Sequence, residues 1–138
     1  MPRRYLLDSG PASDLIFQRH NMQARVEAVK QTGAKVGICI PILGEILGGL
    51  QNSGSRESSL AAVRHKLAKM ICWPFDRNAA YEYGRIFAAL RAKGRPIQSI
   101  DIQLAAIALT LGNTIVVTTD SDLSAIDGLD VENWAIES

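Results

Sequence analysis

Short apolar runs alternate along the chain with longer stretches in which apolar residues recur every three or four positions. The short runs predict strands at residues 4–7, 36–40, 71–75, 114–118 and 131–136. Pro74 cannot donate a hydrogen bond to a neighbouring strand, so the run that contains it fits the edge of a sheet. The run at 114–118 is apolar and rich in β-branched residues, which is typical of a strand buried on both faces.

The periodic stretches predict helices between these strands. We expect one or two helices over residues 13–32, a helix that begins at Pro41, and helices over residues 60–70, 79–92 and 101–111. Residues 8–11 and 52–59 are rich in residues that interrupt regular structure, and they predict loops. Asp76 is a natural N-cap for the helix that follows it.

Strands that alternate with helices imply βαβ units, right-handed crossovers and a parallel sheet covered on both faces. The predicted fold class is therefore α/β, a three-layer α/β/α arrangement with a central parallel sheet. At 138 residues, the whole chain fits a single domain over residues 1–138. Sheets of this kind place their ligands at the carboxyl ends of the strands.

Composition excludes some classes of protein. The chain is 47% hydrophobic and 21% charged, as in globular proteins, and its longest apolar runs are shorter than the ~20 residues of a membrane-spanning helix. Asp8 interrupts the position where a signal peptide would remain apolar. Cys39 and Cys72 lie in apolar runs and read as buried residues of a reducing compartment, although a disulfide between them stays open. We expect a cytoplasmic protein that does not span a membrane.

The net charge of +1 combines two regions of opposite sign. Residues 56–95 contain nine basic and three acidic residues, whereas residues 101–138 contain seven acidic residues and no Lys or Arg. A basic surface beside an acidic pocket fits a metal-dependent nuclease, because basic residues attract phosphate and carboxylates hold the cation. Solvated helix faces would explain the same pattern without any function.

Four acidic residues are predicted to meet at one edge of the sheet. Asp8 ends the first strand, Asp120 follows the strand at 114–118, and Glu45 and Asp101 lie near helix N-termini. Neighbouring carboxylates repel one another, and oxygen ligands without Cys or His favour Mg²⁺ or Mn²⁺ as the compensating ion. Such an ion can activate water against a phosphodiester without a protein nucleophile. Taken singly, each residue also fits an ordinary role as a helix cap, turn former or first-turn charge.

The chain resembles the PIN domains nearly from end to end, and within them the VapC-like toxins of bacterial toxin-antitoxin pairs. The resemblance is carried by Tyr5-Leu-Leu-Asp8, by ILGEILGGL at 42–50, by GRPI at 94–97 through Asp101 to LAA at 104–106, and by VTTDSDL at 117–123 through Gly128-Leu129 to Glu132-Asn-Trp134. The chain departs from the family pattern at Ser9-Gly10, where Thr-Asn is usual, at Pro41, near a position often held by a hydroxyl residue, and at Leu123, where Phe is usual.

This resemblance implies a metal-dependent endoribonuclease whose substrate is RNA and whose cofactor is Mg²⁺ or Mn²⁺. It implies that the catalytic metal ligands are Asp8, Glu45, Asp101 and Asp120, with Asp122 as a weaker fifth member of the cluster. It also implies a VapB-like antitoxin as partner and a homodimer. The apolar positions of residues 15–29 or 42–50 would then form either such an interface or part of the core.

Two other functions stay open. The chain could be a PIN-fold RNA-binding subunit without catalysis, although a dead site would be free to lose its mutually repelling charges. A receiver-like phosphoacceptor module also binds Mg²⁺ beside a strand-end Asp, but no Lys ends a late strand here. Of the remaining residues, we expect His20 and His65 at the surface and Trp73 and Trp134 in packing roles.

Overall fold

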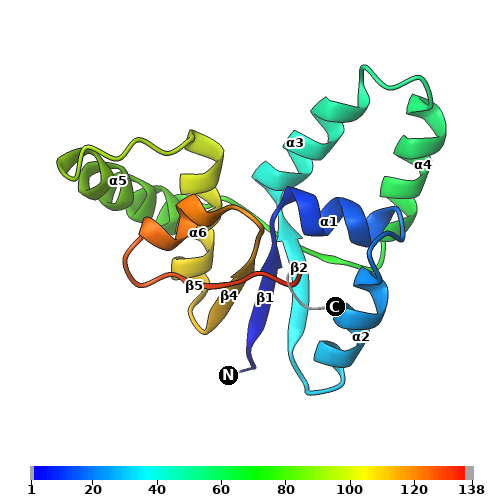
Figure 1. Cartoon of the computed structure of the whole chain (residues 1–138), viewed down its shortest axis with the longest axis horizontal. Helices are drawn as coiled ribbons and strands as arrows, with labels where there is room; N and C mark the ends of the chain where they lie inside the picture. Colours follow the sequence, from blue (N-terminus) through cyan, green and yellow to red (C-terminus); the bar gives the residue numbers. More distant parts are fainter. Residues whose placement is uncertain (1, 136–138) are drawn as a thin grey trace.

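Five short strands form one parallel sheet in the computed structural model, which describes residues 2–135 (Figure 1). The strands are β1 (Arg4–Leu7), β2 (Lys35–Cys39), β3 (Ile71–Trp73), β4 (Thr114–Val117) and β5 (Asp130–Glu132). Their order across the sheet is β3-β2-β1-β4-β5, and every neighbouring pair is parallel. β1 is therefore the central strand. β3, which ends at Trp73 directly before Pro74, lies at an edge of the sheet, as predicted.

The helices of the described residues connect these strands and cover both faces of the sheet. They are α1 (Ser9–Ile16), α2 (Met22–Lys30), α3 (Ile40–Leu50), α4 (Arg56–Leu67), α5 (Arg77–Ala92), α6 (Ser99–Leu111) and the short 3-10 helix η1 (Ser121–Ala125). The connections from β1 to β2 and from β2 to β3 run toward one edge of the sheet. The connection from β3 to β4 runs in the opposite direction, past β2 and β1. Right-handed crossovers in opposite directions put α1 to α4 on one face and α5 and α6 on the other. The predicted three-layer α/β/α fold is confirmed.

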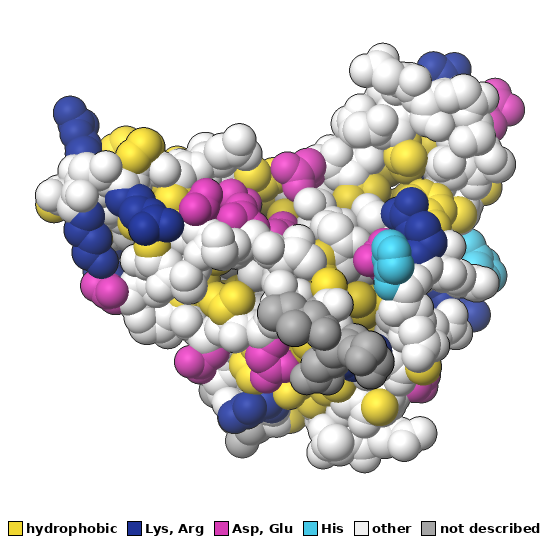
Figure 2. Space-filling view, viewed as in Figure 1, with side chains coloured by type: hydrophobic (Ala, Val, Ile, Leu, Met, Phe, Trp, Pro, Cys, Tyr) yellow, Lys and Arg dark blue, Asp and Glu magenta, His cyan; other side chains and the backbone are white. Residues whose placement is uncertain are grey.

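The helices α3 and α4 extend together beyond the sheet as a pair (Figure 1). Figure 2 shows a hollow between this pair and the part of the molecule formed by α5 and α6. The helices α3 and α6 contact each other at the base of this region. The carboxyl ends of β1 and β4 face the same side, where a parallel sheet places its ligands.

The structure corrects the loop predicted at residues 8–11. Helix α1 begins at Ser9, directly after β1, and Asp8 is its N-cap. Pro11 lies in the first turn of this helix and is tolerated there because first-turn amides have no intrahelical acceptor. The chain therefore turns from strand to helix within one residue, which fixes the carboxylate of Asp8 at the sheet edge.

Other boundaries differ by a few residues. Helix α4 begins at Arg56, so half of the loop predicted at 52–59 is helical; the amide of Ser59 donates to the carbonyl of Ser55 at 3.0 Å. Helix α6 begins at Ser99 rather than at Asp101. The last strand ends at Glu132, and the predicted strand at 131–136 is too long; its final residue lies outside the described residues.

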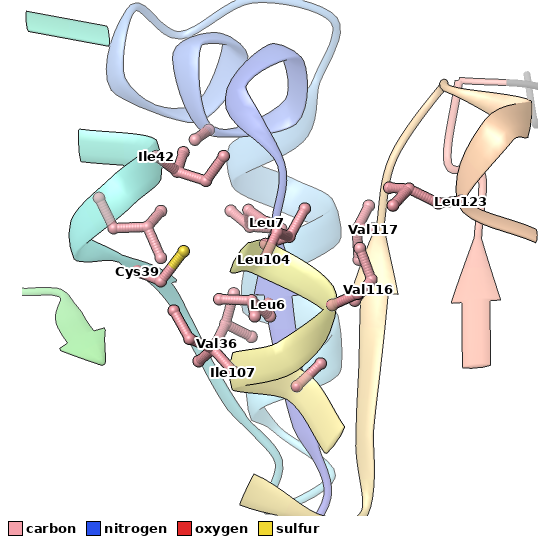
Figure 3. Packing of buried hydrophobic residues seen from close by; sticks show 14 of the residues in the cluster. Leu6, Leu7, Val36, Cys39, Ile42, Leu104, Ile107, Val116, Val117 and Leu123 are labelled. Atoms are coloured by element: carbon pink, nitrogen blue, oxygen red, sulfur yellow. The ribbon is translucent and has the colours of Figure 1, made fainter. Parts of the chain in front are cut away.

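The core lies between the sheet and both helical layers (Figure 3). In this view, Leu6 and Leu7 of β1 lie near Leu104 and Ile107 of α6, and Ile42 of α3 closes the cluster near the strand ends. The buried residues of the stretch at 15–29 also belong to the core, namely Leu15, Ile16, Met22 and Val26. Core burial is therefore the correct reading for that stretch.

The remaining residues singled out in the sequence take structural roles. His20 and His65 are exposed, Trp134 is buried against the ring of Tyr5 at 5.6 Å between centroids, and Trp73 packs against the core. Both cysteines are free, and burial raises the pKa of the Cys39 thiol to about 12, so this thiol stays neutral. No helix within residues 2–135 combines the length and the apolar character needed to cross a bilayer.

Candidate functional site

The predicted acidic residues reach one edge of the sheet from four different elements. Asp8 follows β1, Asp120 follows β4 by three residues, Asp101 lies in the first turn of α6, and Glu45 lies on α3. Figure 2 shows acidic side chains gathered at the base of the hollow between α3–α4 and α5–α6. The neighbouring positions of β1 and β4 in the sheet bring Asp8 and Asp120 close despite their distance along the chain.

A chain of hydrogen bonds fixes the carboxylates of the two strands. Asp8 is only 8% exposed, and its Oδ1 accepts from the Ser9 amide at 2.8 Å while its Oδ2 accepts from the Thr118 hydroxyl at 2.7 Å. The same Thr118 oxygen accepts from the Asp120 amide at 3.0 Å, and Asp120 Oδ1 accepts from the Asp122 amide at 2.9 Å. Asp8, Asp120 and Asp122 are thus held in one network.

Sequence reasoning missed Thr118 as part of this network. Its signal in the sequence is a hydroxyl residue at the end of an apolar strand, two positions before the strand-end acid. The side chain is 2% exposed, and a buried hydroxyl needs hydrogen-bond partners. The Asp8 carboxylate and the backbone amide of Asp120 supply them.

Asp101 reports how closely the acidic side chains approach one another. Its pKa is raised from 3.8 to about 6, first because burial penalises the charged form and then because Asp8, Asp120, Glu45 and Asp122 add negative charge nearby. The other three predicted site residues and Asp122 therefore all lie near enough to Asp101 to raise its pKa. Asp101 is half-buried, whereas Glu45 is exposed on the side of α3 and approaches the group only through its charge.

The donor set fits a hard divalent cation. It consists of carboxylate oxygens, with the hydroxyl of Thr118 behind them and no sulfur or imidazole ligand among the residues named, which is the chemistry that Mg²⁺ and Mn²⁺ favour. Within residues 2–135, however, no three His, Cys, Asp or Glu side chains converge closely enough to form a ready-made ligand cage.

Basic side chains border the acidic ones. Arg95 Nη2 lies 3.3 Å from Asp122 Oδ1, and Lys93 Nζ lies 3.2 Å from Asp127 Oδ2, so the two oppositely charged regions of the sequence meet in the structure. On the other side, a groove of about 620 Å³ runs past Glu45 between α1 and α3, and Arg19 lines it. Gly10 also lines this groove, and a Cβ atom added there would meet no atom within 4 Å.

We predict that Thr118→Val lowers the free energy of unfolding by about 1–3 kcal/mol, because Asp8 and the Asp120 amide each lose a buried hydrogen-bond partner. Urea denaturation measures this change. Thr110→Val is the matched control, since the Thr110 hydroxyl only adds a bond to the Ala106 carbonyl of its own helix. An equal loss of unfolding free energy in both variants would mean that the hydrogen bonds around Asp8 add nothing to the stability of the fold.

Comparison with known proteins identifies the family of this chain. Residues 5–129 match the model of the PIN domain. The curated relatives include the tRNA(fMet)-specific endonuclease VapC of Shigella flexneri, 28% identical over 133 residues, which are 96% of this chain and 98% of the relative. The protein of the same name from Salmonella typhimurium is 29% identical over 90 residues, 65% of this chain and 68% of the relative.

Solved structures give the same result for the fold. The crystal structure of VapBC2 from Rickettsia felis, bound to a DNA fragment from its promoter, superposes with a TM-score of 0.87 at 22% identity, covering 95% of this chain and 98% of that one. The structure of DNA-bound VapBC from Salmonella typhimurium has a TM-score of 0.85 at 25% identity and covers 97% and 99%. The three-layer architecture is thus shared with solved proteins.

Proposed function

The chain belongs to the PIN domain family, and we propose that it is an endoribonuclease that hydrolyses RNA phosphodiester bonds with Mg²⁺ or Mn²⁺. The metal ligands in this proposal are Asp8, Glu45, Asp101 and Asp120. Its main support is the placement of these carboxylates at one edge of the sheet, close enough that Asp8, Asp120 and Glu45 add to the effect of burial in raising the pKa of Asp101. The two curated VapC relatives, both named as tRNA(fMet)-specific endonucleases, support hydrolysis of RNA.

The side chains of this chain would prepare the site for the ion. Thr118 and the Ser9 amide hold the Asp8 carboxylate in a fixed orientation, so a cation would meet one ligand already in place. Below about pH 6, Asp101 would release its proton on binding, because a positive charge favours the ionised carboxylate. The bound ion would polarise the phosphodiester and lower the pKa of an attacking water. Arg19 and Arg95, on opposite sides of the acids, would attract RNA phosphates.

We further propose that the chain is the toxin of a toxin-antitoxin pair, held inactive by a VapB-like protein, and that it forms a homodimer. The VapBC complexes among its structural relatives support the partner. Helix α3 offers an apolar surface, because Ile40 is 50% exposed and Leu43, Leu47 and Leu50 are only half-buried. Free Cys39 and Cys72 fit the reducing cytoplasm, which we propose as its location.

A cleavage assay tests the proposed activity. Purified protein is incubated with initiator transfer RNA, with elongator transfer RNAs and with total cellular RNA, in Mg²⁺, in Mn²⁺ and in chelator. We expect discrete fragments in the metal-containing reactions and none in chelator, with initiator transfer RNA cut first. Glu45→Gln should lose the cleavage and keep the fold, because the carboxylate is exposed and makes no hydrogen bond or ion pair within residues 2–135.

Intact RNA in every reaction, with Glu45→Gln indistinguishable from the wild type, would contradict the proposal. Retention of RNA on a filter under those conditions would favour the RNA-binding subunit without catalysis. The absence of a ready-made ligand cage in residues 2–135 is the observation that favours this second candidate. The family match argues against the receiver-like module.

A further inference from the structure

Aromatic rings form a row along one face of α5. Phe75 meets the ring of Tyr83 edge-on, with centroids 6.1 Å apart and planes at 88°, and Tyr83 lies nearly parallel to Phe87 at 6.3 Å and 14°. Phe87 is 46% exposed, whereas α5 anchors itself to the core through Ile86 and Leu90. The Phe87 ring therefore presents a face to solvent that helix packing does not require.

This row runs to the edge of the acidic site. The Tyr83 hydroxyl lies 2.9 Å from Ser99 Oγ, at the start of α6 and two residues before Asp101. Arg91 follows Phe87 by one helical turn, and Arg95 follows in the next loop. A shallow pocket of about 250 Å³ joins these parts and is lined by Phe87, Leu90, Arg91, Arg95, Pro96 and Ile97. We call Tyr83, Phe87, Arg91 and Arg95 the α5 strip.

The residue types in the α5 strip indicate the class of ligand that it would bind. Flat aromatic faces stack on nucleic-acid bases, and arginine side chains bind phosphates, so the two together are typical of single-stranded nucleic-acid sites. In double-stranded RNA the bases already stack on one another and offer no free face to Phe87. The positive charge of Arg91 and Arg95 favours a polyanion over a second copy of this chain, which would present the same arginines.

We propose that the α5 strip binds unpaired nucleotides of RNA and leads them into the acidic site, with a base stacked on Phe87 and phosphates at Arg91 and Arg95. The proposal rests on the proposed nuclease function. Arg95 is the link between the two surfaces, because its guanidinium lies 3.3 Å from Asp122, at the border of the acidic cluster. An incoming phosphate would exchange for the Asp122 carboxylate on this half-exposed arginine.

Binding without cleavage tests the strip separately from catalysis. Full-length protein in chelator is titrated with a fluorescent ten-nucleotide oligouridylate and, in parallel, with a duplex RNA of the same length, at several salt concentrations. Phe87→Leu keeps an apolar side chain but removes the flat ring, so we expect about tenfold weaker binding of the oligouridylate, and no change for the duplex. Arg91→Gln should reduce the slope of the logarithm of the binding constant against the logarithm of the salt concentration by about one, because one phosphate contact is lost.

Tyr81→Leu is the matched control, because Tyr81 is a 76% exposed aromatic residue of the same helix that belongs to none of the ring pairs formed within residues 2–135. It should bind both RNAs as the wild type does. Melting curves of each variant establish that it folds. Sedimentation of each variant at the same concentrations reports its oligomeric state.

The outcomes separate the strip from the nuclease. Unchanged affinity in Phe87→Leu, an equal loss in Tyr81→Leu, or no binding of oligouridylate by the wild type up to about 100 µM would each overturn the proposal. If a variant of the strip changes the sedimenting mass of the protein but not its affinity for RNA, a second copy of the chain is the occupant of the strip, and this result would also overturn the proposal. Binding that depends on Phe87 in a protein that never cleaves RNA would support the strip and contradict the nuclease. Cleavage without any dependence of binding on Phe87 would do the reverse.

Discussion

Replacing Asp101 by asparagine is expected to stop RNA cleavage and, at the same time, to make the metal-free protein more stable. If Asp101 is a metal ligand, as we propose, its loss should lower the rate about a hundredfold or more, because ligand carboxylates hold the ion in position. The gain in stability follows from the burial of Asp101 and from the carboxylates around it, both of which penalise its ionised form in the folded protein. Cleavage rates and melting curves of one purified variant measure both effects.

The stability gain has a defined dependence on pH. In the folded chain the pKa of Asp101 is about 6, above the 3.8 of a free side chain, so the unfolded chain releases this proton first as pH rises. The contribution of Asp101 to stability is therefore greatest below pH 4, falls between about pH 4 and 6, and stays low above that. At pH 7 to 8, asparagine should recover about 1–2 kcal/mol after allowance for partial exposure, a rise in melting temperature of roughly 2–6 °C.

Asp130→Asn is the control for this experiment, because Asp130 is an exposed carboxylate at the start of β5. It should change neither the rate nor the melting temperature. Adding Mg²⁺ should raise the melting temperature of the wild type more than that of the Asp101 variant. A variant that melts below the wild type at pH 8 without metal would contradict the raised pKa of Asp101 from which the gain is predicted.

Replacing Gly37 by alanine is expected to destabilise the fold by about 3 kcal/mol, or to prevent folding. Gly37 lies in β2 opposite Ile71 of β3, and a methyl group added there would lie 2.5 Å from the Ile71 carbonyl oxygen and 2.9 Å from its Cβ. Backbone cannot move aside as a flexible side chain can, so β3 would have to shift from the sheet. Urea denaturation of the variant gives the magnitude.

Gly48→Ala supplies the comparison for this second variant. Gly48 lies within α3, and a methyl group there would meet no atom within 4 Å. Alanine should stabilise the helix by about 0.5–1 kcal/mol, because glycine loses more backbone freedom on folding. Stability changes of the same sign in both variants would contradict the crowding described at Gly37.

Much of this architecture could be predicted from local patterns. The buried strands at the centre of the sheet produce long apolar runs, and the amphipathic α5 produces a regular spacing, so β1, β4 and α5 were predicted close to their observed limits. The N-cap at Asp76 was also confirmed, since its carboxylate accepts from the Ala79 amide at 2.9 Å. The placement of the strand-end and helix-start acids at one edge of the sheet followed from the predicted parallel sheet.

The remaining features depend on contacts that no local pattern contains. Pro11 and Gly10 interrupt regular structure in most settings, and only the capping bond of Asp8 makes them the start of a helix. Thr118 could be placed in the acidic network only after β1 and β4 were known to be neighbours. The contact between Arg95 and Asp122 likewise needs the loop after α5 to return to η1.

The hydrogen bond from Thr118 to Asp8 joins residues 110 positions apart in the sequence. Non-local pairings of this kind form late and slowly, because a long segment of chain must be ordered before they can close. A chain still being made on the ribosome has Asp8 from the start, yet it lacks the threonine that orients this acid and the strand that lies beside it. Hydrolytic competence is therefore among the last properties that a newly made molecule acquires, which leaves an interval in which the growing chain is harmless to the RNA around it.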